Sequence, residues 1–214
     1  RVDDGRGSVA PDQVREVAEQ YVSAGSQIIL TNTFGASRLS LANFGLAEKT
    51  AEINMAGVRI SREAAGGRAH VFASIGPTGR MLITRETTEE ELQNVFEEQA
   101  NAQARAGADG IIIETMIDVE EARIAAIAAK HTGLPVIVSM VYDSGEDKDR
   151  TMMGNSPEEV VAEISKIGVD GFGANCGQGI EAFLPICRRL RQATDLPIWI
   201  KPNAGLPEII DEET

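Results

Sequence analysis

The chain has 214 residues, 43% of them hydrophobic, which suits one sizeable core, and we expect a single domain over residues 1–214. Its formal net charge of −13 argues against nucleic-acid and anionic-membrane binding, because both depend on clustered Lys and Arg. The longest apolar runs are far shorter than the roughly 20 residues of a membrane span, and no signal-peptide pattern precedes them. With two cysteines and no need of a disulfide, we expect a cytoplasmic protein with free thiols.

Short apolar runs alternate along the chain with segments of helical period. The predicted strands are Gln27–Phe34, His70–Gly76, Gly110–Met116, Pro135–Tyr142, Gly171–Cys176 and Pro197–Asn203. The predicted helices are Pro11–Ser23, Lys49–Ala65, Thr88–Ala106, Val119–His131, Ser156–Ile167 and Gly179–Thr194. Most of the strands are apolar throughout, as strands covered on both faces should be.

This alternation predicts parallel βα units and favours an α/β (β/α)₈ TIM barrel. An open doubly wound sheet is the alternative, but no glycine-rich phosphate fingerprint follows a first strand, and polar residues follow many different strands. A barrel of this type needs eight strands, and only six are recognisable. We therefore expect the first and last strands to be missing from this sequence or from an ordered structure.

In such a barrel the active site lies at the carboxyl ends of the strands. Glu114 ends an apolar run there, where a carboxylate needs a cationic partner or donors to stay ionised; it either binds a ligand's ammonium group or caps a neighbouring loop. Cys176 could act as a nucleophile, as a soft metal ligand or as an inert thiol, whereas Cys187 falls on the apolar stripe of a helix and is predicted to be core.

The two histidines, His70 and His131, are predicted at the opposite end of the barrel, so that no usable histidine supports a Ser-His-Asp or Cys-His hydrolase. A metal site would then depend on sulfur, carboxylate or amide oxygen. The acidic run Asp143–Asp149 is predicted to be a solvated loop or a mobile lid.

Several sequence blocks, in order, resemble the homocysteine S-methyltransferase family, and the first of them is similar to its cobalamin-dependent methionine synthase branch. Taken together they are more specific than any single short motif. The blocks are Ile29-Leu30-Thr31-Asn32-Thr33-Phe34-Gly35-Ala36, Ser74-Ile75-Gly76-Pro77-Thr78-Gly79, Ile113-Glu114-Thr115, Gly173-Ala174-Asn175-Cys176 and Pro202-Asn203-Ala204-Gly205.

The resemblance implies a zinc ion held by three cysteines. Cys176 matches one of them, while the vicinal pair of the family's last strand has no counterpart in this chain. Asn203 matches an asparagine that lies close enough to coordinate the metal when substrate is absent. No catalytic residue beyond the metal site is implied.

The resemblance also implies an amino-acid pocket. Glu114 matches the residue that binds the ammonium group, and the block around Ser74 and Gly76 matches the backbone that grips the substrate. We place Asn32 and Thr33 in the same pocket. Asp4, in Asp4-Gly5, is a candidate remnant of an aspartate on the family's first strand.

Together these features imply a zinc-dependent methyltransferase that activates homocysteine as a thiolate and methylates it to methionine. The donor would be methylcobalamin carried by a corrinoid-binding domain or protein. One alternative is a related barrel enzyme that uses another small thiol or another donor, such as S-methylmethionine or a corrinoid protein. A second alternative is a non-catalytic, truncated relative that acts as a partner protein.

Overall fold

The computed structural model describes residues 11–177 and 179–205, and these contain one parallel sheet of six strands. The strands are β1 (Ile28–Leu30), β2 (His70–Ile75), β3 (Gly110–Met116), β4 (Val136–Met140), β5 (Gly171–Cys176) and β6 (Ile198–Pro202). Each predicted strand is therefore present; β3 and β5 have the predicted bounds, and the other four are shorter than predicted by one to five residues.

Helices connect successive strands, and one further helix precedes β1. They are α1 (Pro11–Ser23), α2 (Arg38–Ala42), α3 (Thr50–Ala65), α4 (Glu89–Arg105), α5 (Val119–Lys130), α6 (Pro157–Ile164) and α7 (Ile180–Ala193), with the 3-10 turns η1 (Ala47–Lys49) and η2 (Ser165–Ile167). The sequence pattern missed α2, which is too short to show a helical period but begins at a capping serine, Ser37. Among the described residues no helix is long and apolar enough to cross a bilayer.

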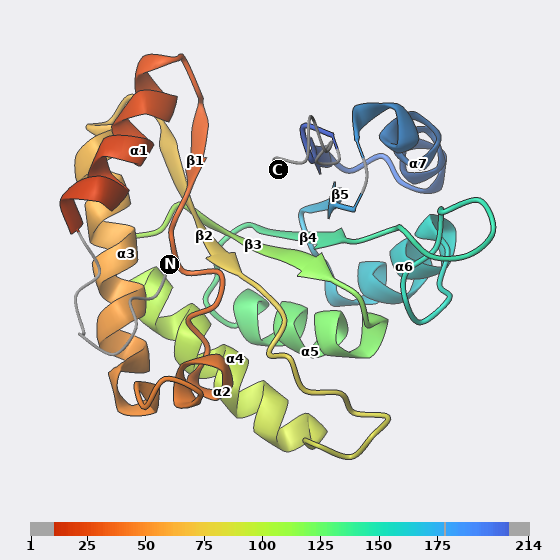
Figure 1. Cartoon of the computed structure of the whole chain (residues 1–214), viewed down its shortest axis with the longest axis horizontal. Helices are drawn as coiled ribbons and strands as arrows, with labels where there is room; N and C mark the ends of the chain where they lie inside the picture. Colours follow the sequence, from red (N-terminus) through yellow and green to blue (C-terminus); the bar gives the residue numbers. More distant parts are fainter. Residues whose placement is uncertain (1–10, 178, 206–214) are drawn as a thin grey trace, which may run out of the picture.

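The strands follow one another in the sheet in chain order, from β1 at one edge to β6 at the other. Figure 1 shows this sheet as an arc, with the helices along its outer side and an open gap between its two edges. A doubly wound sheet reverses its strand order at a switch point, so the sequential order excludes that alternative. The fold is a curled α/β half-barrel.

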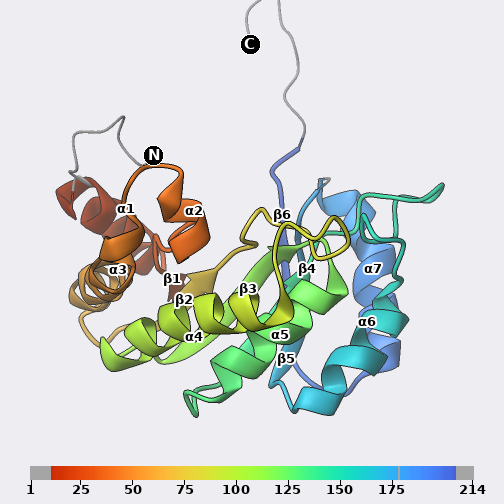
Figure 2. The same cartoon turned by 90° about the horizontal axis from the view of Figure 1, so that it is seen from below.

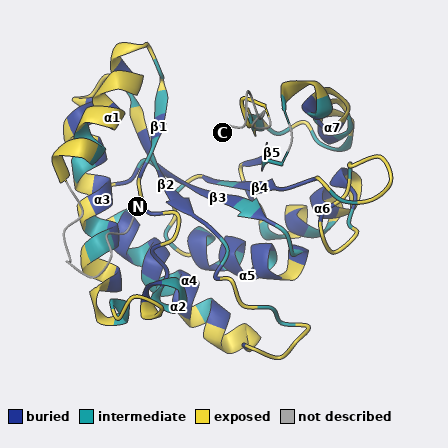
Figure 3. Cartoon of the chain, in the orientation of Figure 1, coloured by how far each residue is buried: buried dark blue, intermediate teal, exposed yellow. Residues whose placement is uncertain are grey.

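Alternate strand residues face the helices and form the main core, which Figure 3 shows as a dark band along the sheet and the inner faces of the helices. On β3, Ile111 and Ile113 pack against the helices, where Phe96 of α4 is also fully buried. The helix-facing residues of the other main strands are Ala73, Ile75, Val136, Val138, Met140, Phe172 and Ala174. The residues between them, among them Ser74 and Glu114, must face the concave side of the arc.

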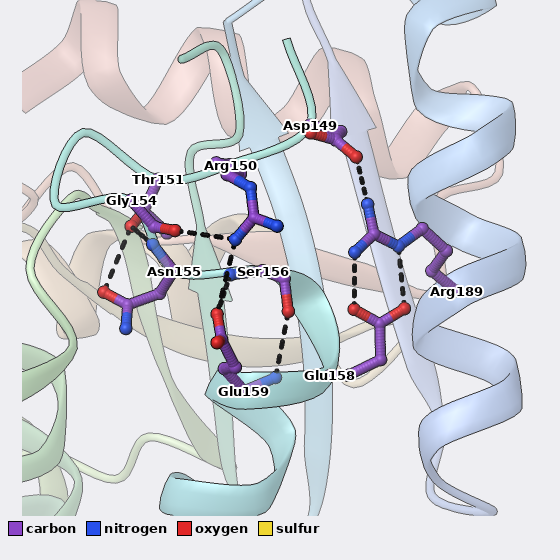
Figure 4. A network of polar contacts seen from close by, with 9 residues as sticks. All are labelled: Asp149, Arg150, Thr151, Gly154, Asn155, Ser156, Glu158, Glu159 and Arg189. Carbon is purple, nitrogen blue, oxygen red and sulfur yellow. Dashed lines mark hydrogen bonds and ion pairs between the residues drawn. The ribbon is translucent and has the colours of Figure 1, made fainter. Parts of the chain in front are cut away.

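The loop between β4 and α6, predicted to be solvated or a lid, is tied to two helices (Figure 4). Arg189 of α7 donates two hydrogen bonds to Glu158 of α6, at 2.7 and 2.6 Å, and also contacts Asp149 of the loop. Hydrogen bonding to Arg189 is the main reason why the pKa of Glu158 is lowered to about 2. Ser156 and Glu159 cap α6 reciprocally, which fixes the end of the loop.

Candidate active site at the carboxyl ends of the strands

Polar side chains from several strands meet at the carboxyl edge of the sheet, as predicted. Ser74 lies on β2, Glu114 on β3, Asn175 and Cys176 on β5, and Lys201 on β6. Figure 2 shows the loop after β2 and the loop after β4 at this same edge, so the site is flanked by both connections. This is the edge that carries the active site in parallel barrels.

Glu114 is the charged centre of this edge, with only 5% of its surface exposed. Its Oε1 accepts a hydrogen bond from Ser74 Oγ at 2.6 Å, and its Oε2 accepts one from Lys201 Nζ at 2.5 Å. The cationic partner that the burial of Glu114 demanded is therefore Lys201. The sequence interpretation missed this role, although a lysine that ends an otherwise apolar strand was a usable signal.

Asn175 organises the second half of the site and is 1% exposed. Its Oδ1 accepts hydrogen bonds from the Thr115 amide at 2.9 Å and from Ser139 Oγ at 2.6 Å. Its Nδ2 donates to Thr115 Oγ1 at 2.7 Å and lies 3.5 Å from Cys176 Sγ. Thr115 and Cys176 both have left-handed backbones, with φ of 63° and 59°, a strained conformation that side chains of this kind rarely adopt. Asn175 thus holds the strained strand ends that present the sulfur.

Cys176 and Asn203, the two predicted metal residues, lie on neighbouring segments. Cys176 is a half-buried free thiol, and Asn203 Nδ2 donates to the carbonyl of Gly177 at 3.0 Å. Within residues 11–177 and 179–205, no group of three or more His, Cys, Asp or Glu side chains could hold a metal ion. The described residues therefore supply a single soft ligand and do not by themselves make a zinc site, which needs three or four ligands.

Asn32 and Thr33 are adjacent in the block from Ile29 to Ala36, but their side chains lie in different surroundings. Asn32 is exposed and lines a groove of 640 Å³ with Thr31, Trp199 and Lys201. Thr33 is buried, donates to the Ser74 carbonyl at 2.8 Å and lies 3.1 Å from Gln103 Nε2 of α4. The structure thus brings Asn32 to the groove beside Lys201, while Thr33 braces β2, and a substrate-binding role for either residue stays a prediction.

Gly76 follows β2 and allows a close approach of an aromatic ring. A Cβ atom there would lie 2.5 Å from the ring of Phe34, so only glycine fits between that ring and the strand end. The Gly76 amide also donates to the Phe34 carbonyl at 3.0 Å, which joins the strand ends of β1 and β2. Asp4 lies outside the described residues.

The remaining sequence candidates lie elsewhere. His70 and His131 sit beside Asp109 and Glu97, with ring Nδ1 atoms 3.9 and 3.1 Å from the carboxylates, and neither takes part in the polar cluster. Cys187 is half-buried on α7, so its assignment to the core holds only in part.

A buried carboxylate also holds the loop after β2. Glu121 of α5 accepts hydrogen bonds through Oε1 from the Thr78 amide at 2.8 Å and from Thr78 Oγ1 at 2.6 Å. Burial is the largest influence on the pKa of Glu121 and raises it, and the bonds from Thr78 offset part of that rise. No cation pairs with this carboxylate in the described part of the chain, so its charge is costly to the fold.

Replacing Glu121 by glutamine should stabilise the protein increasingly as the pH rises. The pKa of Glu121 is higher in the folded state, so its contribution to stability is greatest at acid pH and falls as the pH rises above 4.5 toward the folded pKa. Glutamine keeps an acceptor for Thr78 and has no charge to bury. Urea unfolding of the full-length protein at pH 4.5, 6 and 7.5 measures the difference, and a pH-independent difference would contradict this account. Glu121→Ala should instead cost about 1–3 kcal/mol at acid pH, because two buried donors lose their acceptor, and less as the pH rises, because the variant also removes the buried charge.

The described residues thus form a curled parallel half-barrel with a buried carboxylate and a cysteine at its carboxyl edge. The family model "Homocysteine S-methyltransferase" matches residues 4–214, and the chain belongs to that family. The methionine synthases of Mycobacterium leprae (strain TN) and Mycobacterium tuberculosis (strain ATCC 25618 / H37Rv) are 25% and 24% identical to it over 209 residues. The alignments cover 92% of this chain and 17% of each relative, so the chain spans only a small part of their length.

Solved structures support the fold. The metallated form of the homocysteine methyltransferase MmuM from Escherichia coli matches with a TM-score of 0.80 and 24% identity, over 92% of this chain and 73% of that one. The apo form of the same protein matches with a TM-score of 0.74 and 22% identity, over 95% and 76%. At this identity the likeness establishes the shared α/β architecture.

Proposed function

We propose that this chain is the homocysteine-binding module of a zinc-dependent methyltransferase that converts homocysteine to methionine, with methylcobalamin as the immediate methyl donor. Family membership and the similarity to two methionine synthases support the reaction and the substrate. The observation that carries the proposal is the buried Glu114, held by Ser74 at the same sheet edge as Cys176. The carboxylate can bind the ammonium group of an amino acid, and the cysteine thiol can bind a soft metal ion. A site for homocysteine in a zinc enzyme needs both.

The proposal extends to the architecture. We expect a complete (β/α)₈ barrel in the full-length protein, of which residues 1–214 are one incomplete domain. The edges β1 and β6 lie on either side of a groove lined by apolar residues such as Ile28, Leu30 and Trp199. Exposed strand edges and apolar grooves promote aggregation, so further strands would protect both. A cytoplasmic location and a corrinoid-binding partner domain or protein belong to the same proposal.

The residues of this chain have distinct roles in the proposed reaction. Glu114 accepts the ammonium group of homocysteine, while Ser74 fixes the orientation of that carboxylate. Cys176 would be one zinc ligand, with Asn203 beside it, and the remaining ligands would come from outside the described residues. Bound zinc would lower the pKa of the homocysteine thiol from about 8.5, so that a thiolate is present at neutral pH.

Zinc analysis of the full-length, freshly reduced protein tests the proposal. We expect about one zinc per chain in the wild type and in Cys187→Ser, whose half-buried thiol lies on α7, and a strong loss in Cys176→Ser. Adding homocysteine should release protons from the zinc-loaded wild type. Absence of zinc from the intact protein would refute the mechanism and favour the non-catalytic relative. Zinc without homocysteine-dependent proton release would favour another thiol.

A further inference from the structure

Lys201 is the most exposed member of the cluster around Glu114. Its side chain is 46% exposed and that of Glu114 is 7% exposed, and the two are joined at 2.5 Å. Ser74 occupies the other carboxylate oxygen, so Lys201 is the partner that can leave. Lysine has a long flexible stem and a strongly hydrated ammonium group, which makes it an exchangeable partner. Lys201 also lines the groove beside Asn32, which gives the displaced ammonium room to move.

A substrate ammonium that binds Glu114 must compete with this lysine. Both cations seek the same Oε2 atom, and two ammonium groups around one buried carboxylate repel each other. If Lys201 is displaced, it is left without its anion, and no other ion pair of Lys201 occurs in the described part of the chain. A ligand that brings an ammonium and a carboxylate on one carbon atom resolves both problems at once.

We propose that Lys201 determines specificity for zwitterionic α-amino acids by exchanging partners with the substrate. The substrate ammonium takes the place of Lys201 on Glu114, and the substrate carboxylate pairs with the released Lys201. This inference rests on the proposed function and deepens it, because it explains how the pocket selects an amino-acid thiol over other thiols. The exchange keeps every charge paired before and after binding.

The exchange predicts weak binding of two truncated ligands, for different reasons. A thiol amine without the carboxylate, 3-sulfanylpropan-1-amine, must displace Lys201 and gives it no anion in return. A thiol acid without the ammonium, 4-sulfanylbutanoate, leaves the Glu114–Lys201 pair closed and finds no free cation. Both should bind the wild type much more weakly than homocysteine does, because each leaves one charge of the array unpaired.

Calorimetric binding of these three thiols to the full-length, zinc-loaded protein tests the exchange. In Lys201→Met, the affinity for homocysteine should fall by about tenfold to a hundredfold, since one charge-assisted contact is lost. The affinity for 3-sulfanylpropan-1-amine should rise in the same variant, because its competitor for Glu114 is gone. Lys201→Arg should keep the wild-type order of affinities among the three thiols. Lys166→Met, which removes the lysine of an exposed pair with Glu163, is the matched control and should behave as wild type.

The opposite direction of the two changes separates the exchange from a purely structural ion pair. If the ion pair is purely structural, Lys201→Met should lower the affinity for homocysteine and for 3-sulfanylpropan-1-amine together. That result, or no change in either affinity, would overturn the inference and leave the proposed function standing. If the wild type binds none of the three thiols, the proposed function fails together with the inference. A structure of the homocysteine complex decides the point even if Lys201→Met does not fold. Lys201 Nζ should lie on the substrate carboxylate, and its retention on Glu114 would overturn the inference.

Discussion

Replacing Glu114 by glutamine should raise the KM for homocysteine by about a hundredfold while the protein stays folded. Glutamine has nearly the same shape and retains an acceptor for Ser74, but it gives the substrate ammonium no opposite charge. A hydrogen bond to a charged group contributes about 1.5–3 kcal/mol, and an unpaired buried charge costs more, which together correspond to roughly two orders of magnitude. Lys201 also loses its partner and adds repulsion to an incoming ammonium.

Steady-state kinetics of the full-length enzyme measure this effect, with kcat compared at saturating homocysteine. The matched control is Asp170→Asn, which breaks another carboxylate–lysine pair, to Lys130 at 2.9 Å, at the opposite edge of the sheet. That control should lose some stability and keep its KM. A Glu114→Gln enzyme with an unchanged KM but a lowered free energy of unfolding would show that Glu114 is a structural carboxylate instead.

The strands and the polarity of their ends could be predicted from the sequence because both depend on local patterns. Apolar runs such as Gly110–Met116 identify buried strands, and parallel strands place their carboxyl ends at one edge. The pairing of Glu114 with Lys201 spans 87 residues and depends on how far the sheet curls, which no local pattern reports. The parallel α/β architecture therefore follows from the sequence, whereas the partner of its central carboxylate does not.

The block from Ile29 to Ala36 shows a second limit of prediction from the sequence. Asn32 and Thr33 are adjacent just after a strand, where neighbouring side chains point to opposite faces. A match to a family block marks both residues equally, but in the folded protein Asn32 lies at the groove and Thr33 packs against α4. The importance of Asn175 was missed for a related reason. Its neighbour Cys176 carries the recognisable chemistry, whereas three of the four hydrogen bonds of Asn175 join it to residues far away in the sequence.

Replacing Asn175 by alanine should lower the free energy of unfolding by about 2–4 kcal/mol and weaken zinc binding about tenfold to a hundredfold. The change removes a side chain that makes four polar contacts and leaves the Thr115 amide and the Ser139 hydroxyl without their acceptor. It also removes the support for the left-handed backbones of Thr115 and Cys176, so the sulfur should no longer be held in one position.

Urea unfolding of the zinc-free protein and competition with a chelator measure the two effects separately. Ser139→Ala is the control, because it removes one partner of Asn175 and leaves the contacts to Thr115 and Cys176 in place. It should cost about 1 kcal/mol and leave zinc affinity unchanged, and the double variant should cost less than the sum of the single ones, since both remove the same contact. Equal losses of zinc affinity in the two single variants would show that general loosening of the strand ends, and not the bridge from Asn175 to Cys176, weakens the metal site.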